Sequence, residues 1–197
     1  MLSNKGFDLW ADGYDKAVGI SDEENTYPFA GYKKVLGFIF QTILASENAT
    51  VLDIGFGTGT LTTKLYERGC TLYGQDFSSR MIALASEKMP NAHLYQGDFS
   101  KGLVEPLRNC RYDFIVAKYS LHHLTDVQKR VFLSELRNHL KENGKIIISL
   151  FFDPYSLYSI LHLQILICQP SIRIPAQSDI CVKESCGKSR CSSSTTK

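Results

Sequence analysis

The sequence VLDIGFGTG, residues 51–59, combines an apolar run carrying one acid with three glycines at alternate positions. The run predicts a buried strand, and the residues that follow, 60–65, are typical of the start of a helix. Glycine allows a tight turn and lets a ligand approach the main chain without meeting a Cβ. The helix start offers unpaired N–H groups. We therefore expect a small ligand on the loop that contains Gly55, Gly57 and Gly59.

The spacing of these glycines distinguishes between ligands. The dinucleotide fingerprint, G-x-G-x-x-G, requires a third glycine where this chain has Thr60 or Thr62. The acid inside the strand, Asp53, would repel a pyrophosphate but attract the ammonium of an amino-acid-like ligand. S-adenosylmethionine has that ammonium, a sulfonium and no phosphate, so it fits this loop better than NAD does.

Two further acids follow the next expected strands. Asp76 ends the segment 71–76, about 20 residues beyond the glycine loop, where a carboxylate can bind ribose hydroxyls. Asp98 follows the segment 94–97 and is suited to accept from an adenine amine, with Phe99 beside it to pack the ring. One such acid alone is more often a helix N-cap or a turn residue. Three acids at the ends of three successive strands favour a ligand site.

These motifs resemble those of the class I S-adenosylmethionine-dependent methyltransferases, over about residues 7–152. The opening segment also looks like that of small bacterial members that act on small molecules. The resemblance implies that Asp53, the loop glycines, Asp76, Asp98 and Phe99 bind S-adenosyl-L-methionine. The matching elements are FDLWADGYDKAV at 7–18, VLDIGFGTGTL at 51–61, YGQDFS at 73–78, QGDF at 96–99, YDFIVAKYSLHHL at 112–124 and LKENGKIIIS at 140–149.

Strand and helix signals alternate between the motifs. Helices are expected over residues 31–46, over 80–89, and from a capping box at Thr125 to Asn143-Gly144, with strands over 114–117 and 145–152. In the third helix, one face is expected to carry Val127, Val131, Phe132, Leu136 and Leu140. This βαβ rhythm predicts an α/β fold with a doubly wound, Rossmann-like sheet and ligands at the carboxyl ends of its strands.

The chain after Asp153 departs from the family pattern. We expect a methyltransferase domain over 1–152, an atypical sheet-edge segment over 153–175 and a disordered tail over 176–197. Short strands are expected within 161–168 and 171–175, so the sheet would lack a complete terminal antiparallel strand pair. From residue 170 onward the chain has five basic and two acidic residues, which is compatible with a tail that arose by frameshift or truncation.

Composition limits the partners. A formal net charge of +2 is too small to indicate a nucleic-acid surface. The start of the chain has no apolar signal-peptide core, and the apolar stretch 155–168 is too short to span a bilayer. We therefore expect a cytoplasmic protein without membrane contact. In the tail, Cys181, Cys186 and Cys191 have four residues in each gap, which does not predict a metal site.

The reaction implied by the resemblance is methyl transfer to an acceptor. Residues after the fourth expected strand, Lys118, Tyr119, His122 and His123, are candidates for a general base. The two histidines could deprotonate the acceptor or line its pocket, and packing or a helix-entry hydrogen bond is the expected role of at least one of them. Residues 117–120 lack the Asn/Asp-Pro-Pro-aromatic motif of enzymes that methylate base amines. A small-molecule acceptor is favoured. A non-catalytic or impaired methyltransferase-like protein, and a nucleotide-linked oxidoreductase, stay open as alternatives.

Overall fold

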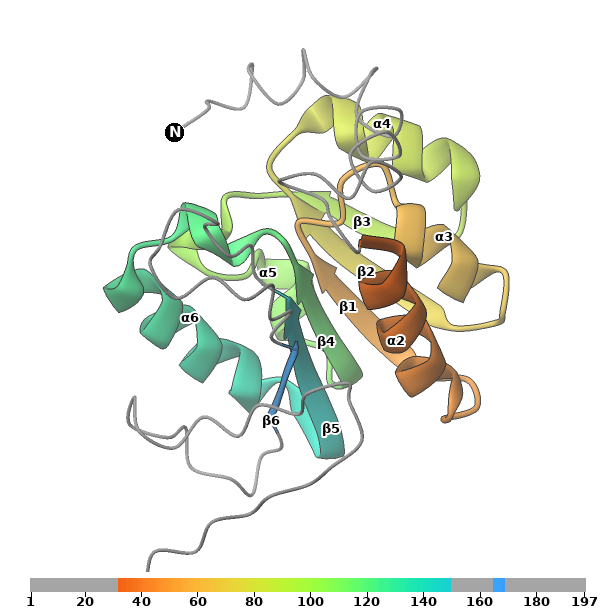
Figure 1. Ribbon diagram of the computed structural model, residues 1–197. Coiled ribbons are helices and arrows are strands. Elements are labelled where there is room, and N and C mark those ends of the chain that lie inside the picture. The colour runs from red at the N-terminus through yellow and green to blue at the C-terminus, as the bar shows by residue number, and fades with distance from the viewer. Residues whose placement is uncertain (1–31, 150–164, 169–197) are drawn as a thin grey trace, which may run out of the picture.

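The computed structural model describes residues 32–149 and the backbone of residues 165–168. One six-stranded sheet forms the centre, in the order β3-β2-β1-β4-β5-β6 (Figure 1). The first five strands pair in parallel, and β6 runs antiparallel to β5. The strands are β1 (Thr50–Ile54), β2 (Thr71–Asp76), β3 (His93–Gln96), β4 (Tyr112–Lys118), β5 (Leu140–Ser149) and β6 (Ile165–Cys168).

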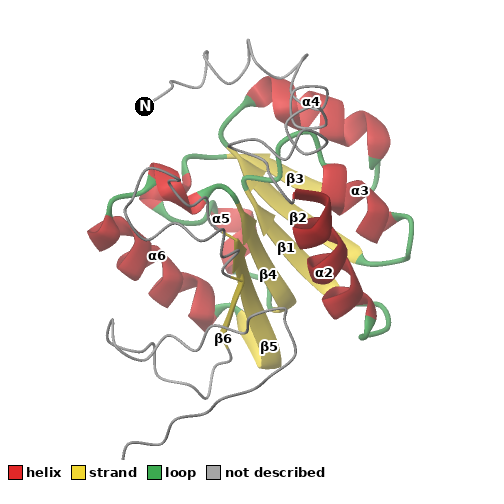
Figure 2. Ribbon diagram, in the orientation of Figure 1, coloured by secondary structure: helices red, strands yellow, loops and turns green. Residues whose placement is uncertain are grey.

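Helices cover both faces of the sheet, as Figure 2 shows. The expected doubly wound α/β sheet is confirmed. The helices are α2 (Tyr32–Leu44), α3 (Thr60–Tyr66), α4 (Ser79–Lys88), α5 (Glu105–Arg108) and α6 (Asp126–Asn138), with two single 3-10 turns, η1 (Phe99–Lys101) and η2 (Leu121–His123).

The first face of the sheet packs against α2 and α3. Val35, Ile39 and Ile43 of α2 are fully buried at helical spacing and share a core with Leu61 and Leu65 of α3. Burial of one such side chain stabilises the fold by roughly 1.5–3 kcal/mol. The helix expected over residues 31–46 is therefore confirmed, with its apolar stripe toward the sheet.

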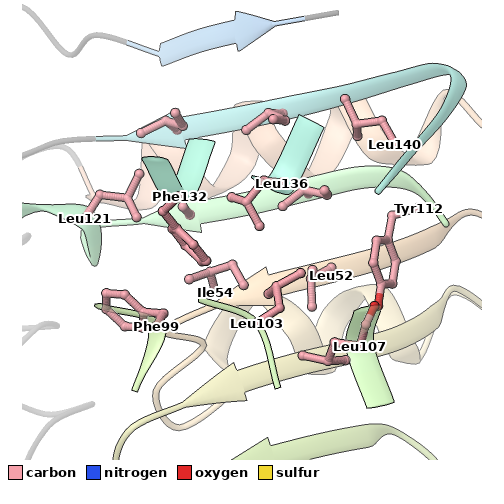
Figure 3. Close-up of a cluster of buried hydrophobic side chains, with 14 of the residues drawn as sticks. Leu52, Ile54, Phe99, Leu103, Leu107, Tyr112, Leu121, Phe132, Leu136 and Leu140 are labelled. Atoms are coloured by element: carbon pink, nitrogen blue, oxygen red, sulfur yellow. The ribbon is translucent and has the colours of Figure 1, made fainter. Parts of the chain in front are cut away.

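The second face packs against α5, α6 and η1 (Figure 3). Leu52 and Ile54 of β1 meet Phe132 and Leu136 of α6 in one buried cluster. Successive residues of β1 lie in the two opposite cores, since Val51 belongs to the first cluster and Leu52 to the second. Because both faces of this strand are buried, successive residues are apolar, which explains the continuous apolar run in the sequence.

Helix α6 begins as predicted and ends earlier than predicted. The capping box is present, because the Thr125 side chain accepts from the N–H of Gln128 and the Gln128 side chain accepts from the N–H of Thr125. The expected apolar face is confirmed only in part. Phe132 and Leu136 are buried as predicted, but Val127 and Val131 are 67% and 66% exposed and do not belong to it.

The helix stop predicted at Asn143-Gly144 is wrong. Strand β5 already begins at Leu140, which pairs with Tyr112, and the register shifts before Phe114. A Cβ on Gly144 would lie 2.8 Å from the backbone oxygen of Tyr112. The sequence needs glycine here because the backbones of β4 and β5 approach closely at this irregularity, so Gly144 is not a helix C-cap.

The short strand expected within residues 161–168 is confirmed over 165–168, where β6 pairs with β5 through Ile146↔Cys168 to Ser149↔Ile165. The rest of the predicted sheet-edge segment, the strand expected over 171–175 and the tail 176–197 lie outside the described residues, as does the opening segment. Among the described residues, no helix is long and apolar enough to cross a membrane.

Candidate functional site

The glycine loop, residues 55–59, connects the carboxyl end of β1 to α3. Gly55, Gly57 and Gly59 all have positive φ, of 68°, 60° and 82°. Only glycine adopts this left-handed conformation at little cost, so the alternate glycines are required by the path of the backbone. The sharp turn predicted from the motif is therefore present.

Two of these glycines also make room for protein atoms. A Cβ on Gly55 would lie 2.6 Å from Cβ of Ser120, and a Cβ on Gly59 would lie 3.0 Å from Cε of Met89. At these two positions the missing side chain lets the residues after β4 and α4 pack against the loop. The loop is thus held closely by its neighbours, in addition to any role in ligand approach.

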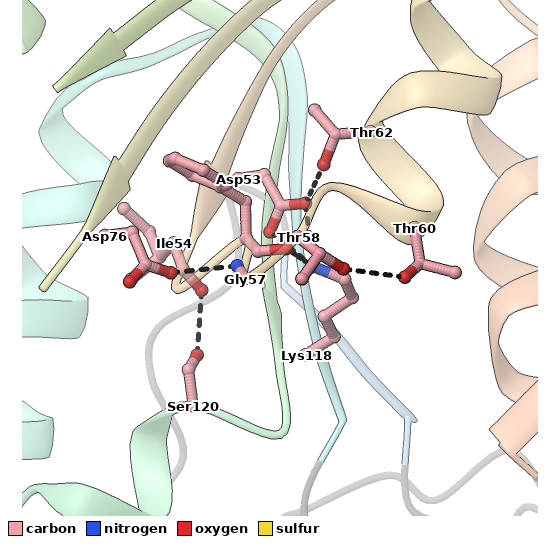
Figure 4. A network of polar contacts seen from close by, with 10 residues as sticks. Asp53, Ile54, Gly57, Thr58, Thr60, Thr62, Asp76, Lys118 and Ser120 are labelled. Carbon is pink, nitrogen blue, oxygen red and sulfur yellow. Dashed lines mark hydrogen bonds and ion pairs between the residues drawn. The ribbon is translucent and has the colours of Figure 1, made fainter. Parts of the chain in front are cut away.

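The acid at the end of β2 is bonded to the glycine loop. Asp76 Oδ2 accepts from the N–H of Gly57 at 2.8 Å (Figure 4). Oδ1 accepts from the N–H of Ser78 at 2.9 Å. The residue is 8% exposed. Burial raises the pKa of Asp76 above its usual value, and the two N–H donors and the charge of Lys118 oppose that rise. The acid and the loop predicted to bind one ligand are therefore in direct contact.

Asp98 and Phe99 lie at the start of η1, after β3. Asp98 Oδ1 accepts from the N–H of Ser100 at 3.0 Å, so this carboxylate caps the turn, and its side chain is 33% exposed. Phe99 is buried and stacks on Phe132 with 6.0 Å between ring centroids. Its Cε1 lies 3.8 Å from the position of a Cβ on Gly55. The structure thus places Phe99 beside the loop, while contact of either side chain with adenine stays a prediction.

Asp53 has an internal cation as its partner. Its carboxylate is 2.9 Å from Nζ of Lys118, at the end of β4, and accepts from Oγ1 of Thr62 at 2.6 Å. Both charged side chains are almost fully buried. The attraction of Asp53 for a ligand ammonium stays a prediction, and the Lys118 ammonium competes for the same carboxylate. The position of Lys118 after the fourth expected strand made it a candidate base, and the sequence carried no signal of this pairing.

The residues after β4 close the site on its other side. Ser120 Oγ donates to the backbone oxygen of Ile54 at 2.8 Å, directly before the glycine loop. Tyr119 has a positive φ of 51°, which is uncommon for a side chain other than glycine, and its N–H donates to the backbone oxygen of Ser149 at 2.9 Å. Ser120 had no signal of its own in the sequence beyond its place after the fourth strand.

The two candidate bases lie in η2, immediately after Ser120. The rings of His122 and His123 are 3.8 Å apart at their centroids. Loss of hydration and the neighbouring His122 charge lower the pKa of His123 to about 4. His123 is therefore a neutral imidazole near pH 7, and the same low pKa makes it a weak base. A catalytic role for either histidine stays a prediction.

Metal ligands do not gather in the part of the chain that the structure describes. Within residues 32–149 and 165–168 there is no group of three or more His, Cys, Asp or Glu side chains placed to hold a metal ion. The polar groups at the loop are backbone N–H donors and carboxylate acceptors, a set suited to the hydroxyls and amines of an organic ligand.

A parallel sheet with a glycine loop after β1 and an acid at the end of β2 is a Rossmann-like arrangement, one that methyltransferases share with dinucleotide-binding proteins. Residues 51–144 match the family described as a methyltransferase domain. The chain is 38% identical over 143 residues to an uncharacterized methyltransferase of Anoxybacillus flavithermus, an alignment that covers 73% of this chain and 64% of that relative. The chain thus spans less than two thirds of that relative's length.

Solved structures show the same fold. An S-adenosylmethionine-dependent methyltransferase from Clostridium acetobutylicum is 25% identical, with a TM-score of 0.56, over 70% of this chain and 57% of that one. A TehB-like methyltransferase from Corynebacterium glutamicum is 19% identical, also with a TM-score of 0.56, over 71% of this chain and 72% of that one. By sequence and fold, this chain is similar to the class I S-adenosylmethionine-dependent methyltransferases.

Proposed function

We propose that this protein binds S-adenosyl-L-methionine on the glycine loop and transfers its methyl group to a small-molecule acceptor. The observation that carries the proposal is the 2.8 Å hydrogen bond between the N–H of Gly57 and Asp76 Oδ2. This hydrogen bond connects two parts of the site: the loop that would lie along the ligand, and the carboxylate that would bind the ligand's ribose. A carboxylate oxygen accepts more than one hydrogen bond, so Asp76 retains acceptor capacity for hydroxyls.

The residues present fit the cofactor in charge as well. Asp76 and Asp98 supply carboxylate acceptors, and Phe99 supplies an apolar ring beside Gly55. Bound S-adenosylmethionine would supply an electrophilic methyl group on a sulfonium. The chain's part is then to orient the acceptor in line with that bond and to exclude water, effects that can contribute about 7–11 kcal/mol.

A small molecule is the acceptor class that the chain favours. The near balance of 22 basic and 20 acidic residues offers no broad attraction for nucleic acid. The residues that follow β4, Lys118-Tyr119-Ser120, do not form the proline-containing motif of base-amine methylation. For an acceptor that must lose a proton, His122 and His123 are the candidate bases, and the low pKa of His123 makes it a weak one.

Ligand-dependent stabilisation tests the proposal. A ligand at 100 times its dissociation constant stabilises the native state by about 2.7 kcal/mol. S-adenosylmethionine and S-adenosylhomocysteine should each raise the melting temperature of the wild-type protein, and NAD should not. Gly37→Ala, in α2 away from the loop, is the control variant and should respond like wild type, whereas Asp76→Ala should show a clearly smaller rise in melting temperature.

The outcomes separate the alternatives. Stabilisation by NAD alone would contradict the proposal and favour the oxidoreductase. Stabilisation by S-adenosylmethionine without S-adenosylhomocysteine formation across hydroxyl, amine and thiol acceptors would favour a binding protein without turnover. Formation of S-adenosylhomocysteine with one acceptor class would identify the reaction.

A further inference from the structure

Lys118 links three parts of the site through one buried ammonium. Its Nζ lies 2.9 Å and 3.2 Å from the two carboxylate oxygens of Asp53 in β1, and 3.3 Å from the backbone oxygen of Phe56 in the glycine loop. Figure 4 shows the side chain reaching from the end of β4 toward Asp53 beneath the loop. Phe56 lies between Gly55 and Gly57, so this contact ties Lys118 directly to the backbone of the glycine loop.

The environment makes this arrangement specific. The side chains of Lys118 and Asp53 are 4% and 2% exposed, so neither charge can be satisfied by water. An ammonium has three donors, and here they have a carboxylate and a backbone carbonyl as acceptors. The Thr62 hydroxyl of α3 donates a further hydrogen bond to the Asp53 carboxylate, at 2.6 Å. Removing one member of such a pair leaves the other charge buried and uncompensated.

We propose that Lys118 is a positioning residue that fixes the glycine loop for cofactor binding, acting through Asp53 and the Phe56 carbonyl. The inference rests on the proposed function. Lys118 does not serve the acceptor as a base, because its ammonium points into the protein and is bonded to a carboxylate. Asp53 correspondingly serves as the anchor of Lys118, and the cofactor meets the loop that this pair holds in place.

The chain offers a matched control for the test. Lys141 also forms an ion pair with an aspartate of β4, since its Nζ lies 2.7 Å from Asp113 Oδ2. That pair lies at the opposite end of the strand and is partly exposed. Lys118→Met and Lys141→Met therefore make the same substitution in two ion pairs, which lie at opposite ends of β4, and only the first removes a contact with the loop.

Two measurements on the full chain decide the question. In the ligand-free protein, amide hydrogen exchange at Gly57 and Gly59 should be at least about tenfold faster in Lys118→Met, as expected for loss of about 1.4 kcal/mol of local protection. Exchange at the central strand residue Ile115 reports the accompanying change in global stability. By calorimetry, S-adenosylhomocysteine should bind at least about tenfold more weakly. Lys141→Met should change neither quantity.

A second variant keeps the test decisive if Lys118→Met unfolds. The Asp53→Asn/Lys118→Met protein has neither buried charge, and the amide that replaces the carboxylate can still accept from Thr62. It should be better folded than Lys118→Met and should regain part of the affinity for S-adenosylhomocysteine. Wild-type exchange and affinity in a folded Lys118→Met protein would overturn the proposal, as would a double variant no better than Lys118→Met.

Failure of the proposed function gives a different pattern. If the wild-type protein does not bind S-adenosylmethionine or S-adenosylhomocysteine, the proposed function is wrong. The exchange rates of the ligand-free loop still report whether Lys118 holds it. Faster exchange in Lys118→Met would then support a positioning role for another ligand and overturn the assignment of that role to cofactor binding.

Discussion

Replacing Gly55 by alanine tests how the glycine loop is packed. Two separate costs are expected. The φ of 68° is left-handed, which costs an alanine about 1–2 kcal/mol. The new Cβ would also lie 2.6 Å from Cβ of Ser120, which is fixed to the backbone and cannot rotate away. Overpacking of this kind costs about 1–3 kcal/mol. Together they predict a loss of about 2–5 kcal/mol in unfolding free energy, a large fraction of a typical domain's stability.

The steric part of that loss should depend on Ser120. Ser120→Gly removes the clashing Cβ together with the hydrogen bond from Oγ to the Ile54 oxygen, which is worth about 0.5–1.5 kcal/mol. In the Gly55→Ala/Ser120→Gly protein the cost of positive φ persists, but the overlap is gone. The two substitutions should therefore be non-additive, with about 1–3 kcal/mol recovered in the double variant.

Urea denaturation of the wild type and the three variants measures this coupling energy. Gly37→Ala is the control, because nothing lies within 4 Å of a Cβ at that helical position. It should stabilise the protein by about 0.5–1 kcal/mol. Strictly additive losses in the double variant would refute the close packing of Ser120 on the loop. So would a Gly55→Ala protein as stable as wild type.

Three further substitutions address other parts of the structure. Asp76→Asn should weaken S-adenosylhomocysteine binding in calorimetry by about 1.5–3 kcal/mol, the usual worth of a charge-assisted acceptor, and an unchanged affinity would contradict the ribose assignment. Gln75→Leu removes two buried hydrogen bonds, one from the Val104 N–H and one to the Gly102 oxygen. Urea denaturation should show a loss of about 2–4 kcal/mol in unfolding free energy. Near-wild-type stability would refute the structural role of these two bonds. His123 has a pKa of about 4 in the folded chain against 6.5 unfolded, so its contribution to stability is full above pH 6.5 and is lost as pH falls toward 4. The unfolding free energy should therefore fall less steeply between pH 6.5 and pH 4 in His123→Gln than in the wild type. Equal slopes in the two proteins would contradict the lowered pKa.

The local part of the site was predictable because its signals are local. A strand that breaks into alternate glycines, with an acid about 20 residues later, follows from backbone conformation and from the geometry of parallel strands. The structure places Asp76 against Gly57 and Phe99 beside Gly55, as that pattern indicates. The capping box at Thr125 was equally readable, since its two partners are only three residues apart.

The partner of Asp53 was not predictable in the same way. Lys118 is 65 residues away in sequence, and nothing local distinguishes a lysine that ends a strand facing solvent from one that turns inward. The boundary after α6 failed for a related reason. Asn143-Gly144 has the composition of a helix C-cap, but the glycine is required by the backbone of β4, which the local sequence does not contain.

The anchors of the glycine loop come from three different elements. Asp76 of β2 accepts from Gly57, Lys118 of β4 donates to the Phe56 oxygen, and Lys88 of α4 donates to the Thr58 oxygen at 3.0 Å. A loop held in this way loses little conformational freedom when a ligand binds, so less of the binding energy is spent on ordering it. Under the proposed function, substitutions at the anchors should then weaken cofactor binding even where they do not touch the cofactor. The packing contacts of Gly55 and the charge of Lys118 would then support binding together with the surfaces that face the ligand.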